Sequence, residues 1–492
     1  MYLAGIDLGT TGCKSMVFDD SGNIAGEHYI EYGLVFTPDG IEQDAELWWE
    51  HAKTALKKAI DLADIPAADL KGIAVASQGI ASVAVDAGGR PLDMAVSWYD
   101  TRAKGEAEEM AIKYGDNYLF ETTGRHASSL FFPQVLHLKR IKPDLYESAK
   151  YFLMPHDYLV YRLCGKAVTD YTMASGTLCF DTGNHRWIGE MFDHYKIGLE
   201  KFPELRPFGS IAGKMLPYVA GELGLSEDTI VAVGMQDQKA AALGAGIASG
   251  EGIMTLSLGT ASAISCISPE KRIDKSGRLN CHAFDGRRWI MENYVGASGS
   301  SLKWIRDIMF PNMSFKEMDE LAGKSPIGSG NLFFFPALDE KQGKFTGISL
   351  STTKGDMVRA ALEGIAYEVR RCVEIQKGLF QSTGSSMELR AYGGGAGSEL
   401  WCQILADVLN MPVALPRTKE TSNLGAAICA GMALGLFLEE KSEEKSEGKP
   451  IVESIAVFTG GIKKRFEPDP ANARVYEEAF KKYLYTEGDF YG

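Results

Sequence analysis

Short apolar runs rich in β-forming residues alternate with glycine-rich turns along this chain. Near its start, residues 2–7 and 16–18 flank the turn Gly9-Thr10-Thr11-Gly12. Half a chain later, residues 253–256 and 263–265 flank Gly259-Thr260. Each pattern predicts a strand, a tight turn and a second strand. Because Leu-Gly-Thr occurs in both places, the sequence predicts one structural device used twice.

The rest of the pattern predicts an α/β protein with two lobes. Helical spacing and continuous apolar runs alternate. We expect helices at 44–63, 238–243, 354–376, 400–408 and 476–485, and strands at 71–76, 230–234 and 388–392, with a further strand at 81–86 pairing with the segment after Gly88-Gly89. We place the N-terminal lobe at 1–246 and the C-terminal lobe at 247–492. Residues 439–449 hold eight charged residues among eleven, which predicts a solvated loop or linker.

The two predicted turns suit the binding of phosphate groups. Glycine accepts positive φ, so successive backbone N–H groups can converge on an anion while threonine hydroxyls add donors. Asp7 stands just before the first turn, where the second has Ser257. A carboxylate beside phosphates is expected to hold a metal ion. For either turn alone, an ordinary β-hairpin is the simpler explanation, and the pair carries the argument.

Composition and charge limit the partners and the cellular location that we expect for this protein. The 492 residues include 51 Lys and Arg against 65 Asp and Glu, a net charge of −14, which disfavours nucleic acid and anionic membranes as partners. The eight cysteines are scattered without metal-ligand spacing, so we expect reduced, mostly buried thiols. Neither a basic leader nor an apolar run of transmembrane length is visible, which predicts a cytoplasmic protein without a membrane span.

Two further segments follow predicted strands. Asp237 stands where an apolar strand gives way to a helix, a place where α/β proteins collect ligands, although an ordinary helix N-cap would explain it too. Gly393-Gly394-Gly395 also lies between a strand and a helix and would let a nucleotide approach the backbone; a plain turn is the alternative. Neither a dinucleotide fingerprint, a P-loop nor a metalloprotease or serine-hydrolase motif is present.

Motifs along nearly the whole chain resemble the FGGY carbohydrate kinases. They occur in the order of that family, at residues 5–12, 98–102, 155–159, 170–175, 234–238, 257–260, 393–395, 420–427 and 466–470. The resemblance implies two lobes of the actin-like ATPase (ribonuclease H-like) fold, each a mixed sheet flanked by helices, with the active site in the cleft between them. It implies that the N-terminal lobe holds a sugar and the C-terminal lobe holds ATP with Mg²⁺.

The resemblance also implies roles for individual residues. Asp237 would be the catalytic base that takes a proton from a sugar hydroxyl during direct in-line transfer, and Asp7 and Asp237 would hold Mg²⁺. The residues expected at the phosphates and the nucleotide are Thr10, Thr11, Lys14, Gly259, Thr260, Gly394, Gly395 and Ala396. The residues expected at the sugar, besides Asp237, are Gln78, Trp98 and Asp100.

The acceptor is less sharply predicted. Residues 77–81 read Ser-Gln-Gly-Ile-Ala, without the Arg-Glu pair of glycerol kinases or the Met-His of xylulokinases. The chain still looks closest to the xylulokinase and gluconokinase branch. We therefore expect a small sugar or polyol, foremost a ketopentose such as xylulose, with gluconate or another polyol or ketose as the alternative. Family members are often homodimers.

Two other functions compete with a kinase. An ATP-driven conformational protein of the Hsp70 or actin kind would share the two hairpins, but it predicts a peptide-binding extension or polymer-forming insertions that the sequence does not show. A catalytically silent sugar sensor would not need the intact Asp7, Asp237 and Gly259-Thr260.

Overall fold

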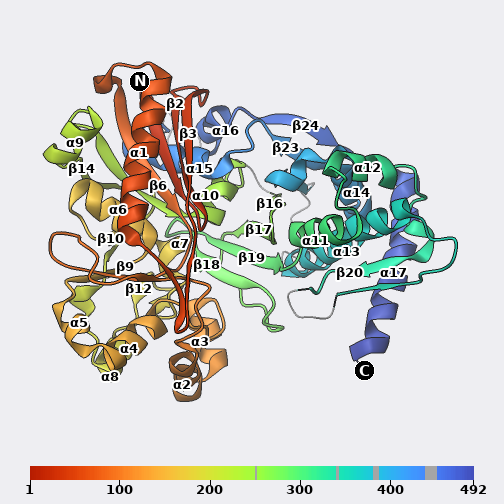
Figure 1. Cartoon of the computed structure of the whole chain (residues 1–492), viewed down its shortest axis with the longest axis horizontal. Coiled ribbons are helices and arrows are strands. Elements are labelled where there is room, and N and C mark those ends of the chain that lie inside the picture. Colours follow the sequence, from red (N-terminus) through yellow and green to blue (C-terminus); the bar gives the residue numbers. More distant parts are fainter. Residues whose placement is uncertain (250–251, 339–342, 380–386, 438–450, 492) are drawn as a thin grey trace, which may run out of the picture. The chain divides into compact units, whose positions relative to one another are not determined.

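The computed structural model describes residues 1–249, 252–338, 343–379, 387–437 and 451–491 (Figure 1). The charged segment expected at 439–449 lies outside these described residues. The chain forms two compact units. Unit 1 comprises residues 1–244, 268–291 and 420–460, and unit 2 comprises 245–267, 292–419 and 461–492.

These units differ from the continuous division expected at residue 246. The first boundary falls at 244/245, close to that expectation, but residues 268–291 and 420–460 belong to unit 1. The physical reason is packing: helix α15 (Thr421–Ala433) covers the sheet of unit 1. A pattern of apolar residues shows that such a helix needs a sheet to cover but does not say which sheet.

Unit 1 is built on a sheet with the strand order β14-β15-β6-β1-β2-β3. Its strands are β1 (Tyr2–Leu8), β2 (Gly12–Asp19), β3 (Ile24–Glu31), β6 (Leu70–Ser77), β14 (Ile211–Lys214) and β15 (Ile230–Gln236). β6 pairs in parallel with both β1 and β15, whereas the other pairings are antiparallel. The apolar runs of β6 and β15 are those of strands buried on both faces.

Alternate residues of β1 face different helices. Ala4, Ile6 and Leu8 lie in one core with Trp48 and other residues of α1 (Ala45–Ala63), whose first turn is capped by Asp44. Gly5 points the other way and approaches α15 so closely that an added Cβ would lie 2.0 Å from the Asn423 carbonyl oxygen. The sheet therefore has helices on both faces, as the sequence predicts.

Smaller elements complete unit 1. The helices are α2 (Lys104–Tyr114), α3 (Asp116–Thr123), α4 (Phe132–Ile141), α5 (Pro143–Ser148), α6 (Pro155–Cys164), α7 (Tyr171–Ala174), α8 (Gly189–Tyr195), α9 (Pro217–Leu223), α10 (Asp237–Gly244) and α16 (Ile451–Phe458). The short strands are β4 (Val35–Thr37), β5 (Gly40–Gln43), β7 (Val83–Val85), β8 (Ala95–Val96), β9 (Tyr151–Leu153), β10 (Val168–Thr169), β11 (Phe180–Asp181), β12 (Arg186–Trp187), β13 (Glu204–Leu205) and β18 (Asn280–Ala283). The ladder partner of β7 is β9, and the expected pairing beyond Gly88-Gly89 is reduced to one bridge between Val85 and Pro91.

Unit 2 repeats the hairpin-led design. Its strands follow the order β17-β16-β22-β23-β24, with β16 (Ile253–Ser257), β17 (Ser262–Ser268), β22 (Glu388–Tyr392), β23 (Val413–Pro416) and β24 (Ile462–Phe466). β16 and β22 run in parallel. The helices are α11 (Gly299–Met309), α12 (Phe315–Ala322), α13 (Lys354–Leu379), α14 (Glu399–Leu409) and α17 (Pro470–Tyr491), with β19 (Trp289–Val295), β20 (Phe333–Phe335) and β21 (Lys344–Thr346) beside them. α17 begins earlier and ends later than the expected helix at 476–485.

Two composition-based expectations can be compared with the structure. All eight cysteines lie among the described residues, are buried and form no disulfide, as expected. Among the described residues, no helix combines the length and apolar character that crossing a bilayer requires.

Helices α10 and α15 pack so closely that Gly425 has no room for a side chain. A Cβ there would lie 1.9 Å from the Ala240 carbonyl oxygen. We expect Gly425→Ala to lower the free energy of unfolding by about 1–3 kcal/mol, because the backbones must move apart. Urea denaturation measures this. Gly105→Ala in α2 is the matched control: no atom lies within 4 Å of its added Cβ, so stability should hold or rise by up to about 1 kcal/mol. Equal losses in both variants would contradict the packing argument.

Candidate functional site

Three parallel strands of unit 1 end at one edge with polar side chains. Ala76 of β6 stands opposite Asp7 of β1 on one side and opposite Met235 of β15 on the other. Because parallel strands end at the same edge, Asp7 and the first residue of α10, Asp237, come close enough to repel each other electrostatically. The expected position of Asp237, at a strand end and a helix N-terminus, is confirmed.

The ionised form of the Asp7 carboxyl is energetically unfavourable in the folded protein. Burial and, second, the charge of Asp237 raise the pKa of its carboxyl to about 7, with Glu420 adding to the shift. The Ser422 hydroxyl lies near enough to lower that pKa, yet Asp7 Oδ1 and Ser422 Oγ are both buried without a well-formed protein hydrogen bond. A cation at this edge would relieve the repulsion and use the unsatisfied oxygen.

The donor set fits Mg²⁺ that is shared with phosphates. Within the described residues, no group of three or more His, Cys, Asp and Glu side chains is arranged to hold a metal ion alone. Mg²⁺ commonly takes one or two carboxylates together with water and substrate phosphates. Asp7 and Asp237 are the two carboxylates at this edge that would hold such an ion.

Asp237 is oriented by its neighbours. Its Oδ1 accepts hydrogen bonds from the Gln236 side-chain amide and, at 2.7 Å, from the Gln238 backbone N–H. Gln236 is held in turn, because its backbone N–H donates to Thr172 Oγ1 at 3.0 Å. The side chain of Asp237 is half-buried, so the carboxylate is positioned yet accessible.

Two motifs that the sequence analysis matched but gave no role support this strand end. Asp170 caps α7 by accepting from the backbone of Thr172, at 2.7 Å, and of Met173. Burial raises its pKa to about 6. His156, fully buried, accepts from the Gly234 backbone N–H through Nε2 at 3.0 Å while its Nδ1 contacts Asp157 at 2.9 Å. Both motifs therefore hold the end of β15 in place.

The first hairpin turn closes tightly, with Gly9 N–H donating to the Gly12 carbonyl at 2.8 Å. Thr10 Oγ1 accepts from Trp98 Nε1 at 3.0 Å, which leaves its own hydroxyl proton to donate. Thr11 is exposed. The half-buried ring of Trp98 stacks on Tyr99 with ring centroids 3.7 Å apart. The structure therefore joins one predicted phosphate residue to one predicted sugar residue.

Gln78 follows β6 at the same edge and is almost fully buried. Its Nε2 donates to Gln43 Oε1 at 2.9 Å, and Gln43 Nε2 donates to the Thr10 carbonyl at 3.0 Å. Gln78 Oε1 is buried without a protein partner. Sequence reasoning missed Gln43, because it lies 35 residues before Gln78 with no motif around it.

Two predicted contacts have other partners in the structure. Asp100 is buried, and both its oxygens are occupied by Arg102 and by the Ile41 backbone N–H. These hydrogen bonds hold its pKa below the usual range against the effect of burial. It is placed to position the Trp98 segment instead of a sugar.

Lys14 pairs with Glu420 at 2.9 Å and with Glu27 at 3.2 Å, so its charge is already balanced by carboxylates. Asn423, from the same segment as Glu420, donates to the carbonyls of Gly5 and Lys14 at 3.0 and 2.9 Å. Sequence analysis had matched 420–427 to the family motif without giving these residues a role. Here they fix the strands that carry Asp7.

Unit 2 brings its two glycine segments together. Gly395 N–H donates to the Leu258 carbonyl at 2.9 Å, and Leu258 N–H donates to the Tyr392 carbonyl at 2.8 Å. Gly394, Gly395 and Ala396 form a 3₁₀ turn beside the second hairpin. The parallel pairing of Ser257 with Tyr392 places both turns at one edge.

A third segment, missed from the sequence, joins them. Gly299 N–H donates to the Gly259 carbonyl at 2.9 Å and Ser300 N–H to the Thr260 carbonyl at 3.1 Å. A Cβ at Gly299 would lie 2.3 Å from the Gly259 oxygen. Gly299 begins α11, so unit 2 collects two glycine turns and a helix N-terminus, the backbone arrangement that suits phosphates.

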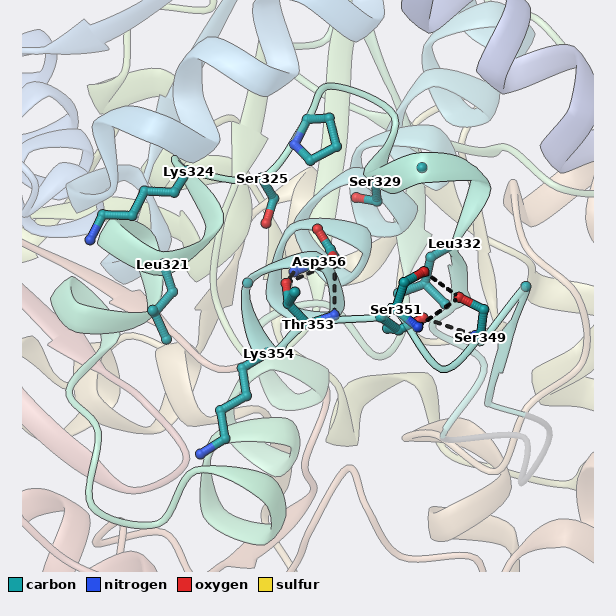
Figure 2. Close-up of a pocket in the computed structure, with 15 residues that line it drawn as sticks. Leu321, Lys324, Ser325, Ser329, Leu332, Ser349, Ser351, Thr353, Lys354 and Asp356 are labelled. Atoms are coloured by element: carbon teal, nitrogen blue, oxygen red, sulfur yellow. Dashed lines mark hydrogen bonds between the residues drawn. The ribbon is translucent and has the colours of Figure 1, made fainter.

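A separate cavity of about 530 Å³ lies elsewhere in unit 2 (Figure 2). Its lining includes Lys324, Lys354 and several hydroxyl side chains. Asp356 accepts from the backbone and hydroxyl of Thr353 at 2.8 and 2.7 Å and so caps the start of α13. None of the predicted site residues lines this cavity.

The raised pKa of Asp7 predicts a pH-dependent stability. Between its ordinary pKa of 3.8 and about 7, the folded state binds more protons than the unfolded state, so stability is lost as pH rises through this window. We expect Asp7→Asn to raise the Tm of the metal-free and nucleotide-free protein at pH 8 by a few °C, and by less at pH 5. Thermal unfolding at both pH values measures this. Asp61→Asn, at an exposed position of α1, is the control. An equal change of Tm at both pH values would contradict the assignment.

Comparison with known proteins agrees with these features. The FGGY carbohydrate kinase N-terminal domain matches residues 2–244 and the C-terminal domain matches 254–434. The chain is 30% identical to xylulose kinase of Bacillus subtilis (strain 168), over 99% of this chain and 97% of that protein.

Solved structures show the same fold. Xylulose kinase from Lactobacillus acidophilus has a TM-score of 0.88 and 24% identity, covering 100% of this chain and 98% of the other. Gluconate kinase from Lactobacillus acidophilus also has a TM-score of 0.88 and 24% identity, covering 99% and 98%. The expected actin-like ATPase fold is thereby confirmed. The chain belongs to the FGGY family of carbohydrate kinases.

Proposed function

We propose that this carbohydrate kinase transfers the γ-phosphoryl group of ATP to a hydroxyl of a small sugar, with Asp237 as the general base. The observation that carries the proposal is the pair of carboxylates at one strand edge, in which Asp237 is oriented by Gln236 and Gln238 while Asp7 repels it. A structural role alone would not explain two mutually repelling carboxylates beside an unsatisfied buried oxygen.

The chemistry asks for positioning more than for covalent catalysis. The acceptor oxygen forms a bond to the γ-phosphorus, the bond from that phosphorus to the bridging oxygen breaks, and ADP leaves. The acceptor proton passes to the Asp237 carboxylate. A base in this role typically contributes about 10² to 10⁴ in rate. Gln236 and Gln238 both donate to Oδ1 and so hold the carboxylate in place for this role.

Bound Mg²⁺ would neutralise phosphate charge at this edge, and Asp7 and Asp237 are the residues that would hold it. The Thr10 hydroxyl keeps a proton to donate to a phosphate oxygen, and Thr11 lies in the same turn. In unit 2, the turns at Gly259-Thr260 and at 394–396 would hold the nucleotide, with the N-terminus of α11 beside them.

Xylulose is the first acceptor to test, because the chain is similar over almost its full length to a xylulose kinase. Gluconate is the second, because the fold is as similar to that of a gluconate kinase. Gln78 and Trp98 are the residues proposed to contact either acceptor. The unpartnered Gln78 Oε1 would accept from a sugar hydroxyl.

The test is acceptor-dependent release of ADP. The purified protein is incubated with ATP and Mg²⁺ against a panel of ketopentoses, polyols and aldonates. At least one acceptor should raise ADP release by 100-fold or more over the rate with water, on the order expected for general-base catalysis. ATP hydrolysis that no acceptor changes would favour an Hsp70-like or actin-like protein instead.

Asp237→Asn tests the base directly. We expect kcat to fall by about 10² to 10⁴, because the amide cannot accept the proton. Acceptor and nucleotide binding, measured by calorimetry, should change by only a few-fold, since the shape is kept. Asp228→Asn, on an exposed carboxylate of unit 1, is the matched control and should retain full turnover. Near-normal turnover in Asp237→Asn would overturn the assignment.

A further inference from the structure

Three basic side chains of unit 1 have no part in the chemistry above. Lys239, two residues after Asp237, is 2% exposed, and His282 of β18 is 5% exposed. Arg125 follows α3 and is half-buried. A lysine is seldom buried to this degree unless its charge is paired, by the protein or by a ligand.

Hydrogen bonds bring the segments of Arg125 and His282 together. Cys281 N–H donates to the Gly124 carbonyl at 2.9 Å, and Ala283 N–H donates to Ser175 Oγ at 3.1 Å. His282 is thereby fixed between two anchored neighbours. Arg125, next to Gly124, extends to donate to the Gly176 carbonyl at 3.2 Å through Nη1. The segments that hold His282 are therefore the ones that hold Arg125.

His282 lies near the two positively charged side chains of this cluster. Burial and, after it, the charges of Lys239 and Arg125 keep the pKa of the His282 imidazole well below the usual range. The ring is therefore neutral. Its two nitrogens, Nδ1 and Nε2, are both buried without a protein hydrogen-bond partner. An unsatisfied buried polar group costs free energy, about 1–3 kcal/mol in typical proteins.

We propose that Arg125, Lys239 and His282 form an anion subsite of unit 1, which takes the carboxylate or phosphate group of an acidic sugar acceptor. The inference rests on the proposed kinase function and names its substrate class. Lys239 shares α10 with Asp237, so the subsite and the base belong to one short helix. An acceptor anchored by its acidic group would then present a hydroxyl to Asp237.

The chemistry of the three groups favours an anion over another sugar hydroxyl. Guanidinium and ammonium groups make their strongest hydrogen bonds to carboxylate and phosphate oxygens, and a neutral imidazole adds one N–H donor. His282 is the buried polar group of this cluster whose two nitrogens lack a protein partner. Where only the correct ligand completes such a hydrogen bond, an enzyme rejects an analogue that lacks the matching group, in other enzymes by up to about 10⁴-fold.

The test uses two matched acceptor pairs with the wild-type protein. D-gluconate is compared with D-glucitol, and fructose 6-phosphate with fructose, by ADP release. We expect the acidic member of one pair to have a kcat/KM about 100-fold or more above its neutral partner. If gluconate is preferred over glucitol, the subsite takes a carboxylate group. If fructose 6-phosphate is preferred over fructose, the subsite takes a phosphate group.

Substitutions in the cluster test whether it causes the preference for an acidic acceptor. Lys239→Met and Arg125→Gln should each raise KM for the acidic acceptor about 10-fold or more while changing kcat/KM for its neutral partner by less than about 3-fold. Lys58→Met, at an exposed lysine of α1, is the control and should keep the wild-type preference. A preference that survives both cluster variants would overturn the subsite.

The two proposals fail differently. Acceptor-dependent ADP release with the neutral members preferred would overturn the anion subsite and leave the kinase proposal standing. No acceptor-dependent release with any sugar would overturn the kinase proposal itself. Because the wild-type comparison decides between acidic and neutral acceptors, the outcome holds even where a cluster variant does not fold.

Discussion

The repulsion between Asp7 and Asp237 is the constraint on which the candidate site depends. Two parallel strands on either side of β6 end with carboxylates at one edge, and burial makes their charges more costly than in water. Left alone, that edge would favour protonation of Asp7. A cation with phosphate ligands would remove this cost, so the repulsion is what the proposed binding of metal and nucleotide phosphate would relieve.

Much of unit 1 can be understood as the support that holds this edge in place. Helix α15 fixes β1 from one face through Asn423 and through the close approach at Gly5. His156 and Thr172 fix the end of β15 from the neighbouring motifs. Such support matters because phosphoryl transfer depends on placing charges accurately. Few of these supporting residues are adjacent in the sequence, yet each secures β1, which contains Asp7, or β15, which leads to Asp237.

In unit 2, the turns that are predicted to bind phosphate are held together by the backbone. The turns at Gly259 and Gly395 and the start of α11 at Gly299 approach one another through main-chain hydrogen bonds, at distances that leave no room for a side chain at Gly299. Backbone N–H groups suit phosphate oxygens of any nucleotide. Under the proposed function, specificity for the acceptor would come from unit 1, which contains Gln78, Trp98 and the cluster of Arg125, Lys239 and His282.

The sequence by itself determined the two hairpins, the alternation of strands and helices, and the place of Asp237 at a strand end, because these depend on local periodicity and on glycine at tight turns. Only the tertiary structure decided which residues meet. It gave α15 to unit 1, showed that Asp100 and Lys14 are balanced by nearby charges, and brought in Gln43, Gly299 and His282. Those outcomes depend on contacts between segments far apart in the chain. The burial and the electrostatic surroundings of each residue are set by these distant neighbours, which a local sequence pattern does not predict.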